Sequence, residues 1–288
     1  MRNFLKYQLI TIFLIAFTFA FGQKNELVKL SSLPTELSEA SGIELLNDTT
    51  FVVINDGGNT ADLFVLNLDG SLRKKVRVLR EKNNDWEDLA ADENYLYIAD
   101  FGNNKNERKN LVILKVKIAS ILSKKEVVAE KIYFNYQEQV SFPPKKEKLN
   151  FDAEALVCIG DSLLILTKVN NVPWTGESQL YYLPKIPGIY SIKKAGELFV
   201  GPNGWFIDAI TGADYYDGKL YIITYFRKIQ LNFAKNGLKK CSETKFKNFT
   251  QKEGIVVKSK NEIYIVDEKA SIIGGGNIYK TKKKDAKH

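Results

Sequence analysis

Short apolar runs alternate with polar turns along most of the chain, and no long amphipathic helical pattern interrupts them. Runs of about four to eight residues rich in Val, Ile, Leu and Tyr, bounded by Gly, Asn and Asp, are typical of β-strands joined by tight turns. The pattern therefore predicts an all-β protein.

One unit of this pattern recurs five times: a small or acidic start, a short strand, a polar turn and a stronger strand. The copies read "SGIELLNDTTFVVIND", "EDLAADENYLYIAD", "EALVCIGDSLLILTK", "TGADYYDGKLYIITY" and "EGIVVKSKNEIYIVD". If Gly42, Asp88, Ala155, Gly212 and Gly254 are equivalent, the steps between copies are 46, 67, 57 and 42 residues. Repeats of about 40 to 50 residues with four strands each are typical of propeller blades, and loops account for the longer steps.

Further strand-like runs follow most pairs and complete the blades, among them "DLFVLNL", "NLVILKVKI" and "QLYYLPK". The last copy ends one strand short, after "NIYKTK", and the early segment "NELVKLSSL" could supply the missing strand. Such a closure would remove an exposed sheet edge. We therefore predict a single β-propeller of four-stranded antiparallel blades, closed by the N-terminal strand. Five blades are counted, and a sixth of degenerate sequence stays open.

The first 22 residues have the pattern of a secretory signal peptide. A short basic region precedes a thirteen-residue apolar run from Leu9 to Phe21, with small residues before Gln23. A transmembrane helix needs about 20 apolar residues, so no stable membrane span is expected. We predict cleavage near Gly22 or Gln23, a propeller domain over residues 23–288, and a secreted or periplasmic protein.

Charge and cysteine content narrow the classes of partner. The formal net charge of +8 falls to +6 without Arg2 and Lys6, and much of the excess lies in "PPKKEKL" and in the basic tail 281–288. Nucleic-acid surfaces interleave Lys and Arg with stacking aromatics, so we expect no nucleic acid partner and a solvated, frayed tail. Cys158 and Cys241 could pair in an exported protein or stay free. The oligomeric state is open.

Acidic residues gather where blade geometry brings strand ends together. The start of the innermost strand and the end of the next, antiparallel strand lie on the same face. The starts carry Ser41, Glu87, Glu154, Thr211 and Glu253, flanked by Glu39, Asp85, Asp152 and Asp208; the ends carry Asp56, Asp100, Lys168, Tyr225 and Asp267. These two columns should converge on one axial mouth.

Carboxylates that lie within about 4 to 6 Å of one another raise each other's pKa or need a counter-charge. Ca²⁺ takes about six to eight oxygen ligands, and the expected ligands are Glu39, Asp56, Glu87, Asp100, Glu253 and Asp267. Backbone N–H groups of a neighbouring blade could serve the same acids without a metal. A residue type present in nearly every blade favours this structural role, so both interpretations stay open.

Residues that break the repeat are candidates for chemistry. Lys168 and Tyr225 replace acids at two strand ends, and Arg227 follows nearby. Together with Glu154 they form the predicted catalytic or substrate-binding set. Lys168 and Arg227 could equally be counter-ions for the acids.

Ligand contacts are predicted at three further positions. Trp86 stands where other blades have Ala or Lys, and Asn103 and Asn104 follow Asp100 in a glycine-containing loop. Trp86, Trp174 and Trp205 could stack on sugar rings. Each of these indoles could also pack between blades.

Composition excludes several catalytic classes. The only histidine is His288, the last residue, which leaves no Ser-His-Asp triad and no histidine-based metal centre. The chain also lacks a G-x-x-x-x-G-K-[ST] phosphate loop. Any catalysis would have to use carboxylates, a lysine or tyrosine, and a metal-activated water.

Seven segments in order carry a family resemblance: "LSEASGIELL", "VINDGGN", "NDWEDLAA", "LYIADFGNN", "FDAEAL", "ITGADYYDGKLYIITY" and "QKEGIVV". Over residues 38–268 the chain resembles a family of secreted bacterial β-propeller proteins without a settled activity. It is similar, more distantly, to phytase-like, gluconolactonase-like and NHL-type propellers. The resemblance implies calcium dependence at the axial face, although the relatives' full metal-ligand set has no clear counterpart here.

Two functions follow from these observations. One is an exported protein that binds a small anionic or polyhydroxylated molecule, a glycan or a partner at the acidic mouth, with Ca²⁺ as a candidate cofactor. The other is a calcium-dependent hydrolase of a phosphoester, lactone or glycoside at the same place. Fold analogy does not decide between them.

Overall fold

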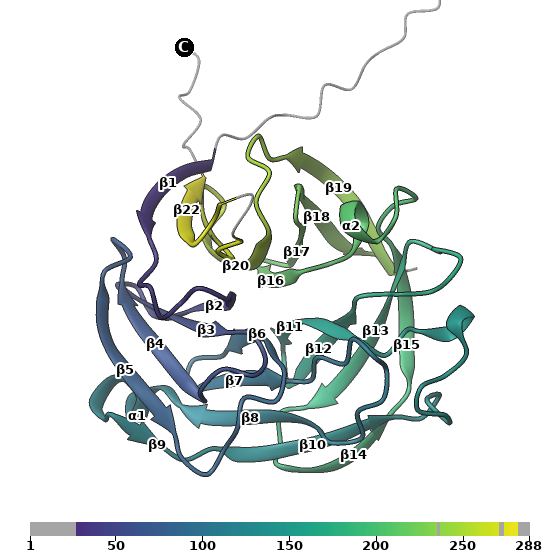
Figure 1. Ribbon diagram of the computed structural model, residues 1–288, viewed down its shortest axis with the longest axis horizontal. Helices are drawn as coiled ribbons and strands as arrows, with labels where there is room; N and C mark the ends of the chain where they lie inside the picture. The colour runs from purple at the N-terminus through teal and green to yellow at the C-terminus, as the bar shows by residue number, and fades with distance from the viewer. Residues whose placement is uncertain (1–26, 235–236, 271–273, 282–288) are drawn as a thin grey trace, which may run out of the picture.

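The computed structural model describes residues 27–234, 237–270 and 274–281, which form five β-sheets around a central axis (Figure 1). The innermost strands are β2 (Ala40–Asn47), β6 (Trp86–Ala91), β11 (Ala153–Ile159), β16 (Gly212–Tyr216) and β20 (Lys252–Ser259). The second strands are β3 (Thr50–Asn55), β7 (Tyr95–Asp100), β12 (Ser162–Thr167), β17 (Lys219–Thr224) and β21 (Glu262–Asp267). The predicted propeller is confirmed, and it has five blades in the described part of the chain.

The outer strands follow the apolar runs noted in the sequence. They are β4 (Asp62–Asn67) and β5 (Leu72–Val78), β8 (Leu111–Lys117) and β10 (Glu130–Tyr136), β13 (Glu177–Pro184) and β15 (Lys194–Phe199), and β18 (Arg227–Ala234) and β19 (Gly237–Lys245). The described residues also form three short helices between blades or strands: α1 (Ile118–Ser123), η1 (Lys146–Lys148) and α2 (Trp205–Asp208).

Two blades gain a fifth strand that the repeat did not predict. The short β9 (Glu126–Val127) pairs in parallel with β5, and β14 (Gly188–Ile192) pairs in parallel with β10. In both cases the added strand comes from a loop that crosses to a neighbouring sheet edge. These strands cover outer edges that would otherwise offer unpaired backbone groups.

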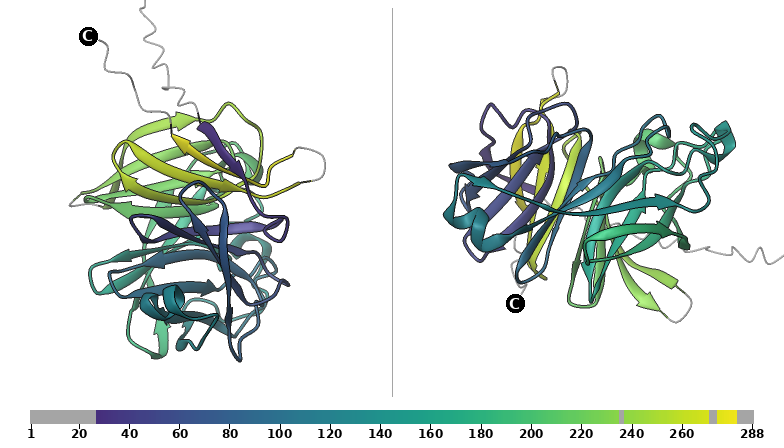
Figure 2. Two further views of the ribbon diagram at one scale, coloured as in Figure 1. Left: turned by 90° about the vertical axis from the view of Figure 1, so that its left-hand side faces the viewer. Right: turned by 90° about the horizontal axis from the view of Figure 1, so that it is seen from below.

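The ring is closed by the N-terminal strand, as predicted. β1 (Leu27–Ser32) pairs antiparallel with β22 (Asn277–Thr281), with Leu27 opposite Thr281 and Ser32 opposite Asn277. Figures 1 and 2 show the purple β1 beside the yellow β22, although the two strands lie at opposite ends of the sequence. The fifth blade therefore depends on both ends of the domain.

Apolar clusters fill the spaces between neighbouring blades. One cluster joins Val52 and Ile54 of the first blade to Leu89 and Ile98 of the second, and all four are buried. Hydrogen bonds add to the packing at the seams, since the Ser41 hydroxyl donates to the Glu87 carbonyl of the next blade. This packing fixes the innermost strands and so the positions of their end residues.

Two segments predicted from the sequence lie outside the described residues. They are the signal-peptide segment and the basic tail, apart from Thr281, which ends β22. Within the described ranges, no helix is long and apolar enough to cross a membrane. Cys158 and Cys241 are both free, because they lie on an innermost and an outermost strand of neighbouring blades.

Candidate functional site

A cavity of about 190 Å³ lies at one end of the central axis. Six carboxylates line it, those of Glu39, Asp56, Glu87, Glu154, Glu253 and Glu268, together with Ala40, Ser41, Asn104, Lys168, Trp205, Tyr225 and Gln251. These residues come from all five blades and lie at or near strand ends. Residues of both predicted columns therefore meet at one axial mouth, although Thr211, Asp100 and Asp267 do not line its cavity.

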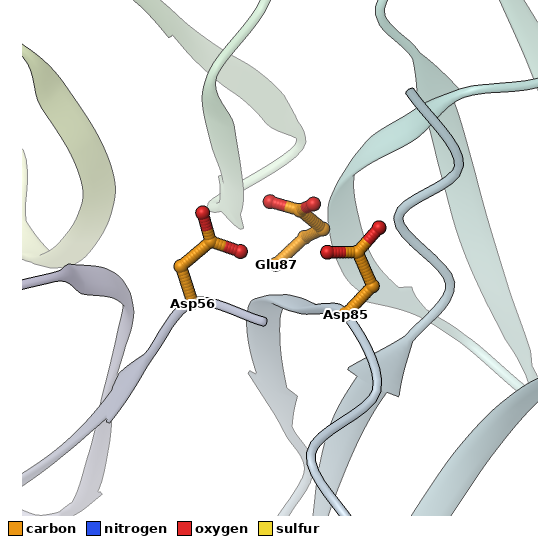
Figure 3. Close-up of side chains that lie close together, drawn as sticks. All are labelled: Asp56, Asp85 and Glu87. Carbon is orange, nitrogen blue, oxygen red and sulfur yellow. The ribbon is translucent and has the colours of Figure 1, made fainter. Parts of the chain in front are cut away.

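Three carboxylates lie especially close together at this mouth. We call Asp56, Asp85 and Glu87 the mouth acids; one oxygen from each lies within 4.8 Å of the others. Asp56 follows β3, Asp85 precedes β6 and Glu87 lies inside β6. Figure 3 shows the three side chains facing a common space.

The mouth acids have few compensating partners. Across the described ranges, no hydrogen-bond donor contacts the carboxylates of Asp85 and Glu87. Burial, with repulsion from Asp56, raises the pKa of Asp85 to about 6. Burial, with repulsion from Glu154 and Asp56, raises the pKa of Glu87 well above its usual value. The site therefore holds more negative charge than it can neutralise by itself.

Two glycines let these carboxylates lie close to the backbone. A Cβ atom on Gly57 would collide with Asp85 Oδ1, and one on Gly102 would collide with Glu87 Oε1. A side chain at either position would therefore displace a mouth acid. The three mouth acids offer oxygen ligands only, and such ligands suit a hard cation such as Ca²⁺.

The one lysine that lines the cavity is paired with a carboxylate. Lys168 Nζ lies 2.9 Å from Glu154 Oε1, and both side chains are buried. Burial alone would lower the pKa of Lys168, but Glu154, Tyr225 and Glu253 outweigh it and raise that pKa well above its usual value. Lys168 therefore stays cationic, and it lies 5.1 Å from the centre of the Trp205 ring.

Two of the expected metal ligands have structural partners instead. Asp100 accepts hydrogen bonds from Asn84 Nδ2 and from the Arg108 guanidinium, each at 2.7 Å. Asp267 accepts from the Thr250 hydroxyl, the Tyr279 hydroxyl and the Asn277 N–H. Neither lines the cavity, because these donors hold both carboxylates against their own blades.

Three other predicted contacts also lie away from the cavity lining. Trp86 is fully buried in the core between the first two blades, so its indole offers no face to a ligand. Asn103 Nδ2 donates to the Phe151 carbonyl at 3.1 Å and ties its loop to the next blade. Arg227 pairs with Asp208 at 2.5 Å and with Glu243 at 3.3 Å, which makes it a counter-ion.

The remaining predicted residues reach the cavity as expected: Glu39, Asp56, Glu87, Asn104, Glu154, Lys168, Tyr225 and Glu253. The sequence did not single out Gln251 or Glu268, and it named Asp85 only as a flanking acid and Trp205 only as a possible stacking indole. Glu268 directly follows Asp267, so the side chain after the strand end points into the cavity while the strand residue itself does not. Strand alternation is the signal that could have identified it.

A second group of acids lies further along the innermost strands. Glu44, Asp88 and Asp214, which we call the interior acids, accept hydrogen bonds from backbone N–H groups. Asp88 also accepts from Leu156 of the next blade at 2.9 Å, and Asp214 accepts from Val257 at 2.6 Å. Burial raises the pKa of Asp214 to about 7. Hydrogen bonding to a neighbouring blade was one of the two roles predicted for the acids at the mouth. Asp88 and Asp214 have this role instead.

Solved structures with the same fold provide the comparison with known proteins. Myxococcus xanthus glutaminyl cyclase matches with a TM-score of 0.55 at 11% identity, covering 90% of this chain and 97% of that one. A glucose dehydrogenase matches with a TM-score of 0.50 at 9% identity, covering 90% and 99%. Regucalcin from Agrobacterium tumefaciens, described as a calcium-binding protein, matches with a TM-score of 0.50 at 10% identity, covering 90% and 94%.

All three of these structures are β-propellers, which confirms the fold and the distant propeller resemblance. No family model matches the sequence, and no curated protein sequence matches it. At such low identity the likeness concerns architecture, and the chemistry must be argued from the site.

Proposed function

We propose that the axial mouth binds a divalent cation, best Ca²⁺, through Asp56, Asp85 and Glu87, and that the bound ion helps to hold a small ligand. The observation that carries this proposal is the group of three carboxylates within 4.8 Å of one another. Two of them, Asp85 and Glu87, lack a hydrogen-bond donor in the described structure. A cation would supply the missing positive charge.

The chemistry of the donors favours calcium over softer metals. The described residues that line the mouth offer carboxylate and amide oxygens and include no cysteine or histidine, and such ligands suit Ca²⁺ or Mg²⁺. Glu39 and Glu268 lie in the same cavity and add negative charge. The calcium-binding description of regucalcin, which shares the fold, supports the same choice.

The rest of the cavity favours an anionic or polyhydroxylated ligand, such as a small acid or a glycan. Oxygens of such a ligand can complete the shell of a calcium ion, which takes about six to eight oxygens. Lys168, Asn104 and Gln251 offer donors in the same cavity. We propose that the protein acts in this way outside the cytoplasm, on the strength of the signal-like pattern at its start.

Calcium binding is tested by calorimetric titration and by thermal unfolding with CaCl₂ or with EDTA. The wild type should bind Ca²⁺ and unfold at a higher temperature with it. The double variant Asp85→Asn/Glu87→Gln should lose both effects. Glu93→Gln, an exposed acid in the turn between β6 and β7, should behave like the wild type. A wild type whose unfolding is the same in CaCl₂ and EDTA would refute the proposal.

A hydrolase is the second candidate, and the Glu253 carboxyl favours it. Burial raises the pKa of Glu253 to about 8, so this group carries a proton at neutral pH and could donate it to a leaving group. Wild type and Glu253→Gln should be assayed with Ca²⁺ against a phosphoester, a lactone and a glycoside. Turnover that Glu253→Gln abolishes while Ca²⁺ still binds would establish catalysis, and no turnover in the wild type would leave binding as the function.

A further inference from the structure

A row of apolar side chains extends outward from the acidic cavity. We call Trp205, Phe206, Ile207, Phe226 and Phe249 the aromatic shelf. Trp205 is 39% exposed, Phe206 51% and Phe249 73%. The Phe206 and Phe226 ring centres are 5.2 Å apart, and those of Phe226 and Phe249 are 5.8 Å apart. Phe206, Phe226 and Phe249 therefore form one continuous apolar surface.

The shelf is continuous with the candidate site. Trp205 lines the cavity, and so does Tyr225. Tyr225 contacts Trp205 and Phe206 edge to face, with ring centres 6.3 and 5.6 Å apart. A molecule seated in the cavity would therefore meet the first ring of the shelf without crossing a gap.

A buried ion pair holds the shelf in place. Asp208, the last residue of α2, is fully buried. It accepts from Arg227 at 2.5 Å and from the Asn203 backbone and side chain at 2.6 and 2.9 Å. Gly201 allows this arrangement, because a Cβ atom there would lie 2.4 Å from the Asp208 carboxylate.

Next to this ion pair, three consecutive large apolar residues, Trp205 to Ile207, are partly exposed to solvent. Exposed apolar surface is unfavourable in water, and a contiguous exposed apolar patch is typical of a binding surface.

We propose that the aromatic shelf binds the apolar chain of an amphiphilic ligand whose oxygen-rich head lies in the acidic cavity. The position of the head rests on the proposed function. Phe206, Ile207 and Phe249 carry no polar side-chain atoms, so they complement an aliphatic or aromatic chain and not hydroxyl groups. The carboxylate-rich cavity next to them suits only a polar group.

Two chain-length series test this proposal: alkyl β-D-glucosides and alkyl phosphates with methyl, butyl, hexyl and octyl chains. Binding is measured by calorimetry and tryptophan fluorescence in CaCl₂, below each critical micelle concentration. In at least one series, affinity should rise by up to roughly fourfold for each methylene that the shelf buries. Phe206→Ser and Phe249→Ser should flatten this dependence. Ile189→Ser, at a residue 82% exposed on β14, should not change it.

The outcomes separate the shelf from the metal site. Affinity that is independent of chain length in both series, or a dependence that Phe206→Ser leaves unchanged, would overturn the shelf proposal even if Ca²⁺ binds. In Asp85→Asn/Glu87→Gln, the dependence on chain length should persist while the affinity for the methyl compounds falls. Dependence on Phe206 in a protein that does not bind Ca²⁺ would support the shelf and refute the metal site.

Discussion

The mouth acids and the interior acids are the same residue types on the same ring of strands, yet their surroundings differ. Asp88 and Asp214 each accept backbone N–H groups from two strands. Asp85 and Glu87 have no such donors in the described structure. Internal bonding therefore accounts for Asp88 and Asp214, whereas Asp85 and Glu87 have no hydrogen-bond donor in the described structure. The comparison teaches that hydrogen-bond donors, and not acidity alone, separate a structural carboxylate from a candidate ligand.

The largest effect on folding should come from removing an interior acceptor. Asp88→Ala leaves the N–H groups of Leu89 and Leu156 buried without a partner, which should lower the free energy of unfolding by about 3 kcal/mol. Urea unfolding at pH 7 measures this loss. Asp88→Asn keeps an acceptor oxygen and should lose less than half as much. An Asp88→Ala protein as stable as the wild type would contradict the structural role.

The mouth acids should behave in the opposite way. Without Ca²⁺, Asp85→Asn/Glu87→Gln should be at least as stable as the wild type, because the change removes repulsion between like charges. With Ca²⁺ at 100 times its dissociation constant, only the wild type should gain about 2.7 kcal/mol. Thermal and urea unfolding with and without CaCl₂ check both expectations. A calcium-free double variant as unstable as Asp88→Ala would remove the distinction between the two groups.

The interior acids should also make stability depend on pH. The pKa of Asp214 is about 7 in the folded protein and near 4 when unfolded, so the folded state binds the proton more tightly. Its contribution is complete below pH 4 and is lost as the pH rises through 7, which amounts to roughly 2 kcal/mol between pH 5 and 7. Urea unfolding across this range should show a steeper fall for the wild type than for Asp214→Asn. Glu44 and Asp88, which lie nearby, are unchanged in that variant.

The smallest effect should appear at Asp100, an acid of the same column as Asp56. Asp100→Asn weakens the charge-assisted bond from Arg108 and should cost about 1 kcal/mol of unfolding free energy. Its calcium response should equal that of the wild type, whereas Asp56→Asn should reduce calcium affinity. Calorimetric titration of the two variants side by side would show whether one column holds both kinds of acid.

The propeller could be predicted from the sequence because every blade repeats the same strand pair. Strand direction alone places the start of the first strand and the end of the second on one face. The sequence also identified Lys168 and Tyr225 through their departure from the repeat. It treated Asp56 and Asp100 as equivalent, but Ala40 pairs with Asn55 and Trp86 with Asp100, so Asp100 lies one position earlier along its strand than Asp56. The donors of Asp100 are Arg108 and Asn84, which lie outside the repeated unit. The same limit applies to β14, whose partner strand belongs to another blade.

The positions of the indole side chains also could not be predicted from the sequence. Trp86 and Trp205 both stand near strand starts, but Trp86 lies within a strand and packs into the core, whereas Trp205 begins a short helix beside the cavity. The spacing of residues in the sequence does not show that Arg227 pairs with the buried Asp208 at the end of α2. That information comes only from the packed structure.

The closing pair of strands has a practical consequence. Asn277 lies opposite Asp267 at the mouth end of the fifth blade, and β22 runs from there to Thr281, which sits opposite Leu27. Leu27 and Thr281 therefore lie side by side in the outer part of the fifth blade, on the face opposite the mouth. A tag joined at either position would be attached to the face opposite the cavity, which favours immobilisation of the protein with its cavity accessible to solution.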